Sequence, residues 1–115
     1  MTKRQYNAIL EYIDEFGGAT IDATTGDIAL LDAGFMVSLA GYEKQVKKAT
    51  FRGLNKAQKI AQQQGGFLGL WLDAGVLYID VSVCVATIQT AFMLGRKNEQ
   101  KAIFDNNAKM SIYLK

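Results

Sequence analysis

The sequence contains no histidine and no proline, and its 115 residues include a single cysteine. Without histidine, the chain lacks the side chain that most often serves as general base or metal ligand at neutral pH. Catalysis by a Ser/His/Asp or Cys/His arrangement is therefore excluded. Cys84 cannot form a disulfide within the chain, which agrees with a reducing, intracellular setting. No cationic residue flanks it, so we expect a small buried side chain rather than a reactive thiol.

The sequence also lacks a hydrophobic run long enough to cross a membrane. Its longest nearly apolar stretch, residues 67–85, is interrupted by Asp73 and Asp80, whereas a span needs about 20 mostly apolar residues. Two segments rich in aromatic and β-branched residues lie on either side of a short Asp-Ala-Gly sequence, which predicts a β-hairpin. The basic residues near the N-terminus are followed by polar ones, so we expect no secretory signal peptide.

Apolar residues at spacings of three and four predict helices elsewhere. Residues 3–16 have this pattern, with Thr2 as a candidate N-cap and Gly17 as a stop. Residues 42–64 have helical composition, and we expect Gly53 to divide them. Residues 86–94 predict a further helix that ends at Gly95.

Short segments with alternating or β-branched residues predict further strands. These are residues 19–22, residues 34–40, and a second hairpin of residues 101–105 and 110–114 around Asn106 and Asn107. Because hairpins outnumber crossovers, we predict one α+β domain covering residues 1–115. Its sheet would be mostly antiparallel, with about five strands and two to three helices packed on one face.

Charge is unevenly distributed along the chain, although the net charge is only +2. Residues 1–36 hold two basic and six acidic side chains, and residues 37–66 hold six basic and one acidic. An asymmetry of this kind can steer a partner.

The basic segment is the first candidate contact surface. If it were helical, most of its cations would lie near one face and could engage nucleic-acid phosphates or an acidic protein surface. Alternatively, they form an ordinary solvated helix face. The residues are Lys44, Lys47, Lys48, Arg52, Lys56 and Lys59.

The acidic residues of the first third are an alternative contact set. They could mimic nucleic-acid phosphates in the basic groove of a nuclease, or they could serve surface and turn roles, since Asp initiates turns. The residues are Glu11, Asp14, Glu15, Asp22, Asp27 and Asp32.

Asp80 is unusual because it lies within an apolar strand. If exposed it needs no explanation, and if buried it must be hydrogen-bonded or paired and its pKa could rise. Together with Asp73 or Asp105 it could bind a metal through oxygen, but these carboxylates are scattered without a metal-binding spacing. We therefore expect no metal, no cofactor and no enzymatic activity. We expect Trp71 and Tyr78 in the core, although an exposed aromatic pair there would be a natural contact anchor.

Several segments of the chain resemble small proteins encoded on phages, plasmids and integrative elements. They are GGATID at residues 17–22, TG at 25–26, GFMVSLAGYE at 34–43, Trp71, VLYIDVS at 76–82 and NEQKAIFD at 98–105. The resemblance implies an accessory protein of the group called large polyvalent protein-associated domains, and many small proteins of such elements disable CRISPR or restriction systems. It thus implies a non-catalytic, anti-CRISPR-like inhibitor that binds and occludes a host defence protein or ribonucleoprotein complex. The alternative is a small nucleic-acid-binding accessory protein. In either case we expect the protein in the cytoplasm of a bacterial host, without a membrane partner.

Overall fold

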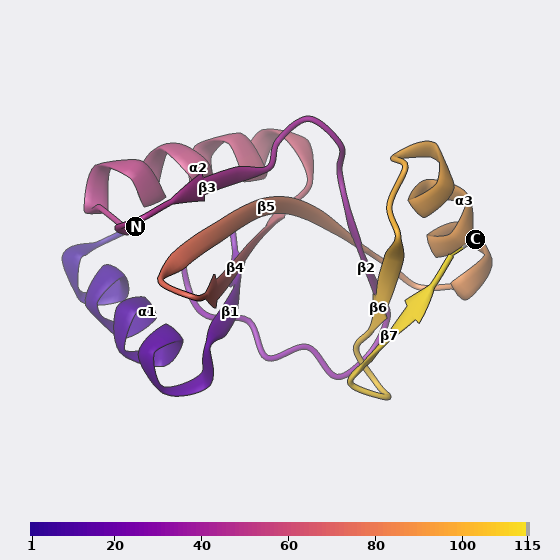
Figure 1. Ribbon diagram of the computed structural model, residues 1–115, viewed down its shortest axis with the longest axis horizontal. Helices are drawn as coiled ribbons and strands as arrows, with labels where there is room; N and C mark the ends of the chain where they lie inside the picture. The colour runs from indigo at the N-terminus through magenta and orange to yellow at the C-terminus, as the bar shows by residue number, and fades with distance from the viewer. Residues whose placement is uncertain (115) are drawn as a thin grey trace.

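The chain builds one curved antiparallel sheet whose helices lie on a single face (Figure 1). The computed structural model describes residues 1–114. Within them are α1 (Lys3–Phe16), β1 (Gly18–Asp22), β2 (Phe35–Ser38), β3 (Lys44–Val46), α2 (Phe51–Gln64), β4 (Phe67–Asp73), β5 (Val76–Val85), α3 (Ile88–Lys97), β6 (Ala102–Asp105) and β7 (Met110–Tyr113). The strand order is β1-β4-β5-β2-β6-β7, and β3 also pairs with β5. The α+β prediction is confirmed, with seven strands in this part of the chain rather than about five.

The predicted hairpin of residues 67–85 is the centre of the sheet. β5 has ten residues and pairs with β4 along one edge; its other edge pairs first with β3 and then with β2. The turn consists of Ala74 and Gly75, which both have left-handed φ angles, 50° and 79°. Two such residues match a type I′ turn, which follows the natural twist of paired strands. In Figure 1, β5 arches across the molecule and links its two halves.

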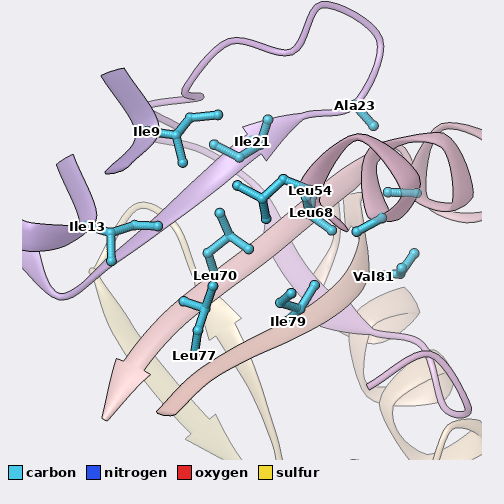
Figure 2. Packing of buried hydrophobic residues seen from close by; sticks show 12 residues of the cluster. Ile9, Ile13, Ile21, Ala23, Leu54, Leu68, Leu70, Leu77, Ile79 and Val81 are labelled. Atoms are coloured by element: carbon cyan, nitrogen blue, oxygen red, sulfur yellow. The ribbon is translucent and has the colours of Figure 1, made fainter. Parts of the chain in front are cut away.

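Alternation along β5 separates a helix-covered face from a helix-free face. Leu77, Ile79 and Val81 are buried under α1 and α2 in the larger hydrophobic cluster (Figure 2). Val83 and Val85 continue the same alternation and pack in a smaller cluster beneath α3. Because the strand pairings run without a bulge from residue 76 to 85, both clusters lie on the same side of the sheet. The opposite side carries no helix within residues 1–114.

The first helix forms as its sequence predicts. Thr2 caps its start in a reciprocal arrangement with Gln5, in which each side chain accepts from the other residue's backbone N–H. Gly17 ends it with a left-handed φ of 81°. Ile9 and Ile13 are buried against the sheet, as the helical spacing requires.

The helix predicted over residues 42–64 is wrong in its first part. Lys44–Val46 form β3, which pairs with residues 77–79 of β5, and α2 begins only at Phe51. Gly53 does not divide the helix; its N–H donates to Oγ1 of the N-cap Thr50 at 3.0 Å. Without β3 this edge of β5 would keep unpaired backbone groups, so sheet pairing prevails over helical composition.

Gly95 does not stop α3 either, since the helix continues to Lys97. Gly95 is buried, and a Cβ there would lie 2.5 Å from Leu114 Cδ1 and 3.0 Å from Ile103 Cγ2. Glycine therefore allows α3 to pack closely on Ile103 and Leu114, and a larger residue would force these side chains to shift.

The prediction that Cys84 is buried is also wrong. The side chain is exposed because Cys84 lies on the helix-free face. Its position in an apolar run of the sequence did not indicate that it would lie on the face of the sheet without helices.

Among residues 1–114, no helix combines the length and the hydropathy that crossing a membrane requires.

Candidate functional site

The helix-free face of the sheet bounds a hollow of about 900 Å³. Strands β1, β2, β4, β5, β6 and β7 contribute to it, together with the end of α1 and the segment that leads into β2. Its polar floor and its mostly apolar wall differ in chemistry. The floor includes Thr20, Ser38, Gly69, Asp80 and Ser82, and the wall includes Phe16, Leu30, Leu31, Met36, Trp71 and Phe104.

Asp80 is the carboxylate on the floor of the hollow. Ser82 Oγ donates to Asp80 Oδ1 at 2.9 Å, and Ser38 Oγ lies 3.4 Å from Ser82 Oγ. Burial raises the pKa of Asp80, and the negative charge of Glu43 acts in the same direction. Hydrogen bonds from the Ser82 and Ser38 hydroxyls oppose this rise because they favour the charged form. The structure lies between the two alternatives for Asp80, since the side chain is partly buried and is hydrogen-bonded to Ser82.

Gly69 makes room for this carboxylate. It lies directly opposite Asp80 in the pairing of β4 with β5. A Cβ at residue 69 would lie 3.0 Å from Asp80 Cγ and 3.2 Å from Oδ2, and still closer to Oδ1. Glycine within a strand often marks such a close approach. Gly69 was a signal in the sequence that the sequence analysis missed.

An aromatic pair lies beside the hollow. Trp71 and Tyr78 are directly opposite each other on β4 and β5, and they are 65% and 39% exposed. Phe16, at the end of α1, is also exposed and packs against Tyr12 in a tilted arrangement, with ring centroids 4.6 Å apart. The prediction that Trp71 and Tyr78 belong to the core is wrong; the structure has the exposed pair that was the alternative. Strand parity is the reason, because both side chains point to the face without helices.

A backbone segment closes the opposite side of the hollow. Asn106 is buried and holds this segment through two hydrogen bonds of 3.0 Å, from its N–H to Gly34 O and from Nδ2 to Ala33 O. Lys109 Nζ donates to Leu31 O. The segment before β2 is thus fixed to the last hairpin, and Leu30 remains exposed at the rim.

The six basic candidates are all exposed, but they do not form one helical stripe. Lys44 lies on β3, whereas Lys47 and Lys48 lie in the connection to α2. Arg52, Lys56 and Lys59 keep the helical spacing on α2, which covers the sheet face opposite the hollow. The basic segment and the hollow are therefore separate surfaces.

The six acidic candidates are spread over three parts of the chain. Glu11, Asp14 and Glu15 are exposed on α1. Asp22 Oδ1 accepts from Thr24 N at 2.9 Å, and Asp27 Oδ1 accepts from Gln5 Nε2 at 2.8 Å. The first contact is the local turn role expected of Asp, whereas the second is a tertiary contact that joins the turn to the start of α1. Asp32 is the member of the set that borders the hollow.

The carboxylates considered for a metal are separated by the fold. Asp73 is exposed at the end of β4, and Asp105 Oδ1 accepts from two backbone N–H groups in the last hairpin, those of Asn107 and Ala108. Within residues 1–114, no group of three or more Cys, Asp or Glu side chains could hold a metal ion.

The chain matches no protein-family model. No curated protein and no solved structure matches it either. Its function must therefore be inferred from its side chains. The hollow brings together one partly buried carboxylate, two hydroxyls and an exposed aromatic rim. These groups can accept hydrogen bonds from a donor ligand and offer apolar area to a macromolecule.

Proposed function

We propose that this protein is a non-catalytic inhibitor of a host defence system, which binds a protein or nucleoprotein target and occludes it. The observation that carries the proposal is the exposed pair of Trp71 and Tyr78 beside the hollow. Large apolar side chains grouped on a surface mark interaction sites more often than chance. Tryptophan and tyrosine are also the residues that most often dominate the binding energy of protein interfaces.

The class of target comes from the resemblance to small proteins of phages and plasmids. CRISPR and restriction complexes act in the bacterial cytoplasm, where we place this protein as well. An exposed, unpaired Cys84 suits a reducing compartment, because thiols persist there without forming disulfides.

A phage challenge tests the proposal. The protein is expressed in bacteria that carry a CRISPR or restriction system, and phage plating is compared with an empty-vector strain. We expect plating to rise with the wild-type protein. Truncation of an interface anchor costs about 2 kcal/mol or more, so Trp71→Ala with Tyr78→Ala should weaken binding to the purified complex about 30-fold.

Met93→Ala is the matched control for the aromatic variant. Met93 is 63% exposed, close to the value for Trp71, but it lies on α3 at the helix-covered face. Equal loss of inhibition in both variants, or no loss in the aromatic variant, would contradict the proposal. Inhibition should also saturate at a fixed molar ratio of inhibitor to complex, whereas turnover at substoichiometric amounts would indicate an enzyme.

Nucleic-acid binding is the second candidate, and the six exposed cations of β3, α2 and their connection favour it. A mobility-shift titration over a salt series tests it, because phosphate contacts make affinity fall steeply with salt. Replacing Lys48, Arg52 and Lys56 by Glu should abolish such binding. The matched control replaces three exposed cations outside the segment, Arg96, Lys97 and Lys101. Absence of a salt-sensitive shift with DNA and RNA would rule this candidate out.

A further inference from the structure

The hollow combines features that suit a flat organic cation. Asp80 carries a negative charge on its floor, and Ser82, which is only 5% exposed, holds one of its oxygens. An ionised carboxylate has about four acceptor positions, so Asp80 retains capacity for further donors. Trp71 and Phe104 supply aromatic surface on the wall.

The charged groups near Asp80 also favour a cation. Glu43 lies close enough for its negative charge to affect Asp80, and Asp32 is at the rim. Lys109 is the cation that lines the hollow, and its ammonium is engaged by Leu31 O. The two carboxylates of Asp80 and Asp32 outnumber the one ammonium among the lining residues, so a positively charged ligand would meet a net negative charge. It would also offset the cost of keeping the partly buried Asp80 ionised.

We propose that the hollow receives an arginine side chain of the protein partner, with its guanidinium bound by Asp80 on the same sheet face as the exposed ring of Trp71. This inference rests on the proposed function, since it assigns a contact within the same binding face. Arginine fits better than lysine because its planar group presents five donors, pairs with carboxylates in a fork and stacks on aromatic rings. The exposed Trp71 and Tyr78 beside the hollow favour a protein over a free metabolite, because they extend the apolar surface beyond a small ligand.

The test is a two-dimensional NMR titration of the whole protein with Nα-acetyl-arginine amide. Fragments of this size bind with millimolar affinity. We expect saturable shifts of the amide signals of Gly69, Asp80 and Ser82. Nα-acetyl-citrulline amide has the same shape without the charge. Its affinity should be lower than that of the arginine compound by a factor of about ten or more, since charge-assisted hydrogen bonds are roughly twice as strong as neutral ones.

Asp80→Asn should reduce arginine binding to the citrulline level, whereas Asp73→Asn, a change at an exposed carboxylate of the same hairpin, should leave it unchanged. The proposal is overturned if the shifts do not saturate, if citrulline binds equally well, or if Asp80→Asn binds like the wild type. Equal binding of Nα-acetyl-lysine amide would overturn the choice of arginine. Tighter binding of agmatine than of the blocked arginine would overturn the choice of a protein partner.

The comparison of arginine with citrulline uses the wild-type protein, so it does not depend on how a variant folds. It also separates this proposal from the proposed function. If no defence system is inhibited but arginine binds through Asp80, the proposed function is refuted and the arginine site in the hollow is supported. If a defence system is inhibited equally by the wild type, Asp80→Asn and Asp73→Asn, the arginine site is refuted and the proposed function is supported.

Discussion

Replacing Gly69 by alanine should have opposite effects on stability depending on the residue at position 80. In the wild type, the new methyl group would lie 3.0 Å from Asp80 Cγ and closer to Oδ1. The carboxylate would have to turn away from Gly69 and would lose its 2.9 Å hydrogen bond from Ser82. In Asp80→Ala this obstacle is absent, so only the effect of alanine on the strand remains.

The magnitudes follow from these two effects. A hydrogen bond to a charged group contributes about 1.5 to 3 kcal/mol, and glycine within a strand costs about 0.5 to 1 kcal/mol relative to alanine. Gly69→Ala should therefore lower the free energy of unfolding by about 1 to 2 kcal/mol in the wild type. The same substitution should raise it by about 0.5 to 1 kcal/mol in Asp80→Ala.

Equilibrium unfolding in urea at neutral pH, followed by far-UV circular dichroism, measures the four proteins of this double-mutant cycle. Ser82→Ala is the control, because it removes the hydrogen-bond donor without adding a methyl group at residue 69. Effects that add within about 0.5 kcal/mol would mean that the two residues are independent. That result, or stabilisation of the wild type by Gly69→Ala, would refute the close contact between Gly69 and Asp80.

Two further predictions concern pH and packing. Because burial raises the pKa of Asp80 above its ordinary 3.8, stability from this group is complete below pH 3.8 and is lost as the pH rises through the raised pKa. Asp80→Asn should thus be more stable than the wild type in urea at neutral pH and lose this advantage below pH 3.8; a pH-independent difference would contradict this. Gly95→Ala should lower the melting temperature through an overpacking cost of about 1 to 3 kcal/mol, although alanine favours a helix. Leu114→Ala should relieve that cost, and stabilisation by Gly95→Ala alone would contradict the packing.

Some helices and strands are determined by residues close to them in the sequence, and local sequence signals predicted these elements. The first helix has its cap, its spacing and its stop within residues 2–17, and the central hairpin has a Gly-containing turn between two apolar segments. The start of α2 was not predictable in this way. The segment before it pairs with β5, about thirty residues further along, and only the assembled sheet provides that edge.

The candidate site was less predictable than the fold. Strand alternation puts Asp80 on the face opposite the buried Leu77 and Ile79. It could not show that all the helices of residues 1–114 would cover the other face, which leaves Trp71 and Tyr78 exposed. That arrangement depends on how three helices pack, and no short stretch of sequence encodes it.

The length of β5 has a consequence for how the molecule comes apart. Its first half supports the cluster under α1 and α2, and its second half supports the cluster under α3. Neither cluster can lose this strand without exposing the other, so both should melt in one cooperative transition, with the β5 amides among the last to exchange with solvent. The two sides of the hollow are formed by the helix-free faces of the strands that carry these two clusters on their other face. A change in the twist of this one strand would therefore widen or narrow the hollow while leaving both hydrophobic interiors packed.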